Sequence, residues 1–199
     1  MKIALIGEFS NVHWTLAENF RSKGHKVTVI STGDGWKNYQ RDVDILFQNK
    51  YQLASFFIKS IINGQFKGYD IVQLINYKFI FSGKYLGFTK KIFLYLKKYN
   101  NKIVLGAFGD DYFYVKACMN GYFRYSPFDR LHIPNSYAHN VLQENYTSIH
   151  EDVNRFIADN SDVIIACAYD YYTAYKNEYY DKVKFIPLPI DVANIKLTP

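Results

Sequence analysis

The residues best suited to chemistry fall in two short stretches, each of which follows an apolar run. The first stretch contains His13, and the second contains the pair Asp110 and Asp111. An imidazole or a carboxylate can accept the proton of a substrate hydroxyl, so these three residues are predicted to act as a general base or to orient such a hydroxyl. His13 could also donate a hydrogen bond to a phosphate at the start of a helix.

Each of these candidates also has a structural alternative. A histidine in this setting is often solvent-exposed or satisfied within the fold, and an aspartate pair after a strand often caps the next segment. Tyrosines after the second stretch could stack on a sugar ring, although most aromatic side chains simply pack. The remaining predicted substrate contacts lie in these stretches or directly after the apolar run 70–75: Gly7, Glu8, Ser10, Asn11, Asn76, Gly109 and Tyr112.

Apolar runs that alternate with helical periodicity predict the elements that must position these residues. Right-handed crossovers place helices on both faces of a parallel sheet, so the pattern predicts a Rossmann-like, doubly wound α/β fold of about six strands. The intervening residues 112–148 are too long for a simple connection, so they are expected to be functional or to carry short helices. The expected strands are 2–7, 26–30, 70–75, 102–107, 162–167 and 183–186, and the expected helices are 12–23, 51–62, 84–99, 151–159 and 169–179.

The expected strand order locates a ligand crevice. In such sheets ligands bind beyond the carboxyl ends of the strands, where the strand order reverses. With the order 3-2-1-4-5 among the expected strands, strand 2–7 would lie beside strand 102–107. The loops 7–13 and 108–111 would therefore meet. These loops contain neither a Gly-x-Gly-x-x-Gly pattern nor a P-loop, so a standard dinucleotide site is not expected.

Composition limits the class of protein. The 199 residues are 49% apolar and 21% charged, which is typical of one globular domain. Because Met1 and Lys2 lead directly into an apolar strand, a cytoplasmic protein is expected. Cys118 and Cys167 stand in unlike contexts and no histidines are closely paired, so neither a disulfide nor a bound metal is expected. The net charge of +6 favours an anionic partner, but no motif that reads nucleic acid is present.

The expected helix 84–99 offers a candidate membrane contact. It carries lysines beside an apolar stripe, and such a helix can rest on an anionic membrane surface. More often the stripe packs in the core while the lysines are solvated. A peripheral contact at the inner face of the membrane would use Lys90, Lys91, Lys97 and Lys98.

Four longer stretches resemble the N-terminal domain of GT-B glycosyltransferases, in particular the large retaining group that uses nucleotide-sugar donors. The stretch "LAENFRSKGHKVTVIST" is similar to that group's first helix and second strand, and "YDIVQL" is similar to its third strand. "ADNSDVIIACAYDYYTAY" looks like its last N-terminal helix-strand-helix. "DKVKFIPLPID" resembles the strand and exit segment that lead to the donor-binding domain.

The resemblance implies a role for the whole chain. Residues 1–191 would form the acceptor-side domain, and 192–199 would begin the linker to a donor-binding domain. The full enzyme would move a sugar from a nucleotide sugar to a glycan or lipid-linked acceptor, in cell-surface polysaccharide biosynthesis, without a metal or other cofactor. This half would be inactive alone. Where the family often has His-Gly-x-Asp, Phe108 replaces the histidine while Gly109 and Asp111 match, so the role of that histidine is not carried over.

Two other functions remain open at this point. A stand-alone, non-catalytic Rossmann-like module would bind an acceptor or a partner without chemistry, and the missing histidine is in keeping with it. A nucleotide-sugar epimerase or reductase is the other alternative, and the missing glycine pattern argues against it.

Overall fold

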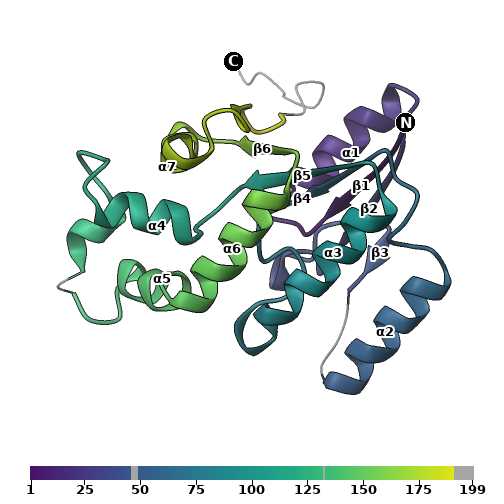
Figure 1. The fold of residues 1–199 in the computed structure, drawn as a ribbon, viewed down its shortest axis with the longest axis horizontal. Helices are drawn as coiled ribbons and strands as arrows, with labels where there is room; N and C mark the ends of the chain where they lie inside the picture. The colour runs from purple at the N-terminus through teal and green to yellow at the C-terminus, as the bar shows by residue number, and fades with distance from the viewer. Residues whose placement is uncertain (46–48, 132, 191–199) are drawn as a thin grey trace, which may run out of the picture.

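A computed structural model of the chain describes residues 1–45, 49–131 and 133–190, and Figure 1 shows its fold. One parallel sheet runs through the described residues in the order β3-β2-β1-β4-β5-β6-β7. Every neighbouring pair of these strands is parallel, so the predicted Rossmann-like α/β fold is confirmed. The strands are β1 (Lys2–Ile6), β2 (Lys26–Ser31), β3 (Val43–Asp44), β4 (Ile71–Leu74), β5 (Lys102–Ala107), β6 (Val163–Ala166) and β7 (Val183–Phe185).

The helices match the expected ones except where local sequence weakens the helical signal. The expected helix 84–99 begins as a 3-10 helix because Gly83 and Gly87 disfavour an α-helical first turn. The long segment 112–148 contains two α-helices, α4 (Tyr112–Met119) and α5 (Tyr137–Asn145). The α-helices are α1 (Val12–Ser22), α2 (Lys50–Ile62), α3 (Thr89–Tyr99), α4 (Tyr112–Met119), α5 (Tyr137–Asn145), α6 (Ser148–Asn160) and α7 (Tyr169–Tyr179), and the 3-10 helices are η1 (Gly35–Lys37), η2 (Gly83–Phe88) and η3 (Pro127–Arg130).

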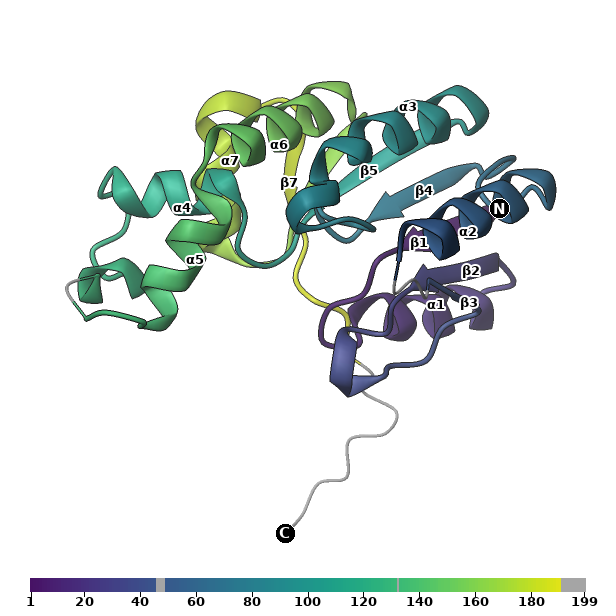
Figure 2. The ribbon, with the colours of Figure 1, turned by 90° about the horizontal axis from the view of Figure 1, so that it is seen from below.

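The hydrophobic core has one large and one small cluster, on opposite faces of the sheet. On β1, Ala4 and Ile6 belong to the large cluster, whereas Ile3 and Leu5 belong to the small one. Successive side chains of a strand point to opposite faces, so the two clusters mark the two faces. The small cluster is completed by Ala17 of α1, and the large one by residues of α3 to α7. Figure 2 shows α1 across the sheet from α3 and α6.

The strand order corrects the predicted position of the crevice. Strand β1 pairs with β4, in the register Ile3 to Ile71. The prediction that strands 2–7 and 102–107 are neighbours is therefore wrong. The reason is β3, where Val43 pairs with Ile30 and takes the outer position that had been given to strand 70–75. Two residues are too few to form a period-2 pattern, so β3 could not be predicted from the sequence. The order reverses between β1 and β4, and the loop after β4 lies at the crevice.

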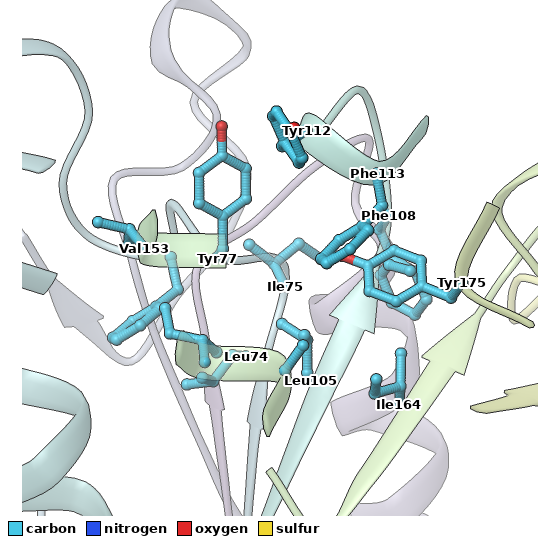
Figure 3. Close-up of a cluster of buried hydrophobic side chains, with 14 of the residues drawn as sticks. Leu74, Ile75, Tyr77, Leu105, Phe108, Tyr112, Phe113, Val153, Ile164 and Tyr175 are labelled. Carbon is cyan, nitrogen blue, oxygen red and sulfur yellow. The ribbon is translucent and has the colours of Figure 1, made fainter. Parts of the chain in front are cut away.

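An aromatic layer packs beyond the carboxyl ends of the central strands. Figure 3 shows Phe108, Phe113 and Tyr175 gathered beyond Leu105 and Ile164. The ring centroids of Phe113 and Tyr175 lie 4.8 Å apart, which joins α4 to α7. Buried aromatic rings contribute large apolar areas to the core. This layer fixes the direction in which the chain leaves β5, and thereby positions the acidic pair that follows. The predicted linker at 192–199 lies outside the described residues.

Candidate functional site

A cleft of about 500 Å³ lies at the carboxyl edge of the sheet, and we call it the acceptor cleft after the hydrogen-bond-accepting carboxylates of Asp34, Asp110 and Glu144 that line it. It is bounded by the loops after β1, β4 and β5 and by α5, and its size is typical of a small-molecule site. Leu188, which follows β7, also lines it. Of the predicted site residues, four line this cleft: Ser10, Asn76, Gly109 and Asp110.

Asp110 presents a half-exposed carboxylate to the acceptor cleft. The hydroxyl of Tyr137, on α5, donates a hydrogen bond to its Oδ2. Burial, together with that hydrogen bond, raises the pKa of Tyr137, so the phenol keeps its proton and acts as donor. The second oxygen of Asp110 has no protein donor among the described residues. Asp110 therefore has an acceptor atom with which to receive a ligand hydroxyl.

Asp111 lies beside Asp110 in sequence but is enclosed, with 1% of its surface exposed. It caps α4, because its Oδ1 accepts from the backbone N–H of Tyr114 at 2.9 Å, and its Oδ2 accepts from the Tyr175 hydroxyl at 2.6 Å. Burial raises the pKa of Asp111 to about 6, although these hydrogen bonds oppose the shift. This geometry matches the capping alternative for Asp111. Tyr112 does not line the cleft either, since its ring stacks on Tyr146 with centroids 5.4 Å apart.

Lys78 is a cleft residue that the sequence analysis did not identify. Its Nζ donates to Asn145 Oδ1 at 2.7 Å, and the Tyr77 hydroxyl donates to the same oxygen at 3.1 Å. Burial lowers the pKa of Lys78, while nearby carboxylates oppose the shift. The residue was missed because the loop after β4 had been placed away from the crevice. A lysine four residues beyond a buried strand was the available signal, once the strand order was known.

The junction between β1 and α1 is filled by a carboxylate of the chain itself. Glu8 is 4% exposed, and its two oxygens accept from the backbone N–H groups of His13 at 3.2 Å and Trp14 at 3.0 Å. Burial raises the pKa of Glu8, and these backbone hydrogen bonds oppose the shift. In dinucleotide-binding members of this fold, the N–H groups at this helix end bind the pyrophosphate. Here Glu8 takes that position.

His13 is fully buried and lines neither of the two cavities at this edge. Its Nδ1 lies 2.7 Å from the Gly7 carbonyl oxygen, and its Nε2 lies 3.3 Å from the Gln73 amide nitrogen. A carbonyl only accepts, so Nδ1 carries the proton and Nε2 accepts from Gln73. Burial lowers the pKa of His13 to about 4, which keeps the ring neutral at pH 7. Asn11 adopts a left-handed conformation before α1 and also does not line the acceptor cleft.

A second cavity of about 550 Å³ adjoins the acceptor cleft. The predicted contacts Gly7 and Glu8 line it, together with residues that follow β2 and β4. Phe9 and Lys78 line both cavities, so the two spaces meet at these side chains.

The four lysines proposed for membrane contact divide into two pairs. Lys90 forms an ion pair with Asp152 at 2.5 Å, and Lys97 donates to the Asn160 carbonyl, so both face α6. Lys91 and Lys98 are exposed, and a membrane contact through them stays a prediction. Within the described ranges, no helix has the length and hydrophobicity needed to cross a bilayer. Nor do three or more His, Cys, Asp or Glu side chains of those ranges gather as a metal site would require.

Comparison with known proteins identifies the fold. No family model and no curated protein sequence matches the chain. Among solved structures, 98% of the chain matches 49% of S. aureus MnaA, solved together with UDP, at 12% identity and a TM-score of 0.50. The chain therefore spans about half the length of MnaA and shares the Rossmann-like arrangement with that half.

Two further solved structures are less similar. One is a Listeria monocytogenes protein described as a UDP-N-acetylglucosamine 2-epimerase, at 13% identity and a TM-score of 0.47, with 92% of this chain and 43% of that chain covered. The other is the 3-alpha-hydroxysteroid dehydrogenase of Pseudomonas sp. B-0831 with NADH, at 12% identity and a TM-score of 0.45, with 94% and 95% covered.

Proposed function

We propose that this chain is the acceptor-side half of a GT-B glycosyltransferase, which moves a sugar from a nucleotide sugar to a glycan or lipid-linked acceptor. The resemblance of four sequence stretches to that family supports the proposal. So does the likeness to half of MnaA, a protein that was solved with UDP. In this proposal a second domain binds the donor, and the half described in this structure is inactive alone.

The observation that carries the proposal is the accessible carboxylate of Asp110 in the acceptor cleft. One oxygen is held by Tyr137, and the other is free to accept a hydrogen bond from an acceptor hydroxyl. A hydroxyl held in this way is oriented for attack on the donor sugar, and its proton has an acceptor as the new bond forms. Phe9 and Phe108 line the same cleft and offer apolar surface to a sugar ring.

The charges of the acceptor cleft favour a sugar over a diphosphate. Its carboxylates are Asp34, Asp110 and Glu144, against the ammonium groups of Lys37 and Lys78. Lys37 is also paired with Asp34 at 2.8 Å. Carboxylates accept hydrogen bonds from sugar hydroxyls but repel a diphosphate. Because Glu8 occupies the helix end that binds phosphates in related folds, we assign the donor diphosphate to the second domain.

The test uses the polypeptide made from its native gene. Its intact mass is first compared with the 23.3 kDa of this chain, because a native protein of that size would favour the non-catalytic binding module. It is then incubated with UDP-sugars and candidate acceptors, and the release of UDP is measured. Acceptor-dependent release is expected. Conversion of the UDP-sugar into an isomer without net release of UDP would contradict transfer and indicate a nucleotide-sugar epimerase.

A matched pair of variants tests the role of Asp110. Asp110→Asn keeps the shape of the side chain but weakens it as a proton acceptor, so turnover should fall at least about tenfold. Asp181→Asn, on the surface and outside both cavities, should keep the wild-type rate. Equal rates for the two variants would remove Asp110 from the mechanism.

A further inference from the structure

Positive charge is concentrated in one continuous part of the chain. Residues 45–109 contain ten lysines, no arginine and one acidic residue, Asp70, which gives this segment a net charge of +9. The whole chain carries +6, so the remaining residues are negative overall. Most of these lysines lie on α2, η2 and α3, and Leu53, Leu86 and Ile92 of these elements pack against the large cluster. The basic helices therefore cover the same face of the sheet.

Helix α2 is apolar on its inner side and also on its outer side. On the inner side, the ring of Phe57 stacks on that of Phe66 with centroids 6.1 Å apart. A helix that meets only water on its outer side normally carries polar residues there. Instead Ile58 is 58% exposed, Ile61 42% and Ile62 75%. Their spacing places them together on one exposed side of the helix, which therefore lacks a partner suited to it.

The outer side of α3 combines apolar and basic side chains. Exposed residues at intervals of three or four form one stripe along the end of η2 and along α3: Phe88, Lys91, Leu94 and Lys98. Lys91 Nζ lies 5.4 Å from the centroid of the Phe88 ring. Among the described residues, neither Lys91 nor Lys98 has an ion-pair partner. Both ammonium groups can therefore meet an anionic partner.

The carboxyl-terminal ends of α2 and α3 are connected, so their outer sides belong to one surface (Figure 1). The Asn100 side-chain amide donates to the Phe66 carbonyl at 3.0 Å, and the Gly68 N–H donates to the Tyr99 carbonyl at 2.9 Å. Lys67 is exposed at this connection. We define the basic face as the following exposed residues: Ile58, Ile61, Ile62, Lys67, Phe88, Lys91, Leu94 and Lys98.

We propose that the basic face docks the protein on an anionic phospholipid membrane. Anionic headgroups attract the lysines, and the aliphatic side chains enter the boundary between the headgroups and the acyl chains. A nucleic acid would pair with the lysines but leave the isoleucines in water. A second copy of the chain would bring two surfaces of the same charge together. An anionic membrane matches both the charge and the apolar side chains, and its binding does not depend on glycosyl transfer.

The basic face differs from the membrane contact predicted from the sequence. Lys90 and Lys97 face α6 and take no part in it, whereas α2 enters with three isoleucines. None of the residues of the basic face lines the acceptor cleft or the second cavity. Variants of this face therefore leave the proposed acceptor site unchanged.

The first experiment measures co-sedimentation of the 199-residue chain with lipid vesicles. Vesicles of phosphatidylcholine are compared with vesicles of an equimolar mixture of phosphatidylcholine and phosphatidylglycerol. Binding to the anionic mixture should be at least about tenfold tighter and should weaken as sodium chloride is added. Equal binding to both kinds of vesicle, or binding to neither, would overturn the proposal.

A matched pair of double variants tests whether the lysines of the basic face are the ones that bind. Lys91→Gln with Lys98→Gln should weaken binding to the anionic vesicles at least about tenfold. Lys23→Gln with Lys176→Gln removes the same charge from exposed residues next to α1 and on α7, and it should weaken binding less than about threefold. Equal losses in the two double variants would show that net charge alone attracts the vesicles, and would overturn the basic face.

A second matched pair tests the apolar contact. Ile62→Gln should weaken binding to the anionic vesicles at least about fivefold, because it removes an aliphatic side chain from the membrane boundary. Ile149→Gln, at an exposed position of α6, should bind as the wild type does. Unchanged binding in Ile62→Gln, in a variant with a wild-type circular dichroism spectrum, would overturn insertion of this side chain.

Two other occupants of the basic face have their own signatures. Tighter binding to a single-stranded oligonucleotide than to the vesicles, unaffected by Ile62→Gln, would assign the face to nucleic acid and overturn the proposal. A dimer in sedimentation velocity that Ile62→Gln dissociates would assign the face to a second copy of the chain. Acceptor-dependent release of UDP is measured without vesicles, so the proposed function and this inference stand or fail separately.

Discussion

The junctions β1–α1 and β5–α4 use acidic residues in similar ways but leave different surfaces. At β1–α1, both carboxylate oxygens of Glu8 accept hydrogen bonds from backbone N–H groups at the start of the helix. At β5–α4, Asp111 does the same for Tyr114, but the neighbouring Asp110 remains half-exposed in the acceptor cleft. In both junctions, therefore, one acidic residue after the strand accepts hydrogen bonds from the start of the next helix. Only an acidic residue that does not have this role can contact a ligand.

The largest expected effect separates the two neighbouring aspartates. Asp111→Ala leaves the Tyr175 hydroxyl and the Tyr114 N–H without their acceptor in a buried site, so it should lower the free energy of unfolding by about 3 kcal/mol. Asp110→Ala removes a half-exposed carboxylate and should cost less than about 1 kcal/mol. Urea denaturation monitored by circular dichroism measures both. Similar losses in the two variants would contradict the division of roles.

A smaller expected effect is on the pH dependence of stability, which should differ in sign between the two junctions. The pKa of His13 is lowered by burial to about 4, so the unfolded chain binds more protons between about pH 4 and 6.5. Stability contributed by His13 is therefore present above that window and is lost as the pH falls through it. The pKa of Asp111 is raised by burial to about 6, so its contribution has the opposite sign: it is present below about pH 4 and is lost as the pH rises toward 6.

The variants His13→Gln and Asp111→Asn reveal these two signs. Between pH 7 and pH 4, the stability advantage of the wild type over His13→Gln should shrink by roughly 2 kcal/mol, whereas its advantage over Asp111→Asn should grow by a similar amount. Other titrating groups largely cancel, since each variant is compared with the wild type at the same pH. Urea midpoints at pH 7, 5.5 and 4 provide the measurement. A change of the same sign for both variants would show that one of these side chains is not buried as described.

The smallest expected effect concerns the cation between the two cavities. Lys78 has a cost of burial and no ion pair within the described residues, so Lys78→Met should change the free energy of unfolding by less than about 1 kcal/mol, with an increase favoured. Thermal unfolding of the wild type and the variant, at a pH where both unfold reversibly, measures this difference. A loss above about 2 kcal/mol would indicate that Lys78 serves the fold, and that its place in the cleft is not explained by a ligand.

The sequence could predict the strands and helices because their signal is local. An apolar run such as Ile3–Ile6, or the helical spacing in Tyr169–Tyr179, is contained within one element, and both elements are found where expected. The same holds for the acidic pair, which the structure places at the end of a strand as expected. Of the predicted contacts, Ser10, Asn76, Gly109 and Asp110 line the acceptor cleft.

The class of fold and the loops that carry candidate chemistry follow from the sequence, since period and composition act over a few residues. Which loops meet depends on long-range contacts. The two-residue strand β3 set the strand order, and that order brought Lys78 to the crevice, where it meets Asn145 from a helix 67 residues further along the chain. Tertiary structure also decided that Asp111 is enclosed and Asp110 is not. Burial depends on contacts between distant residues, and no local pattern encodes them.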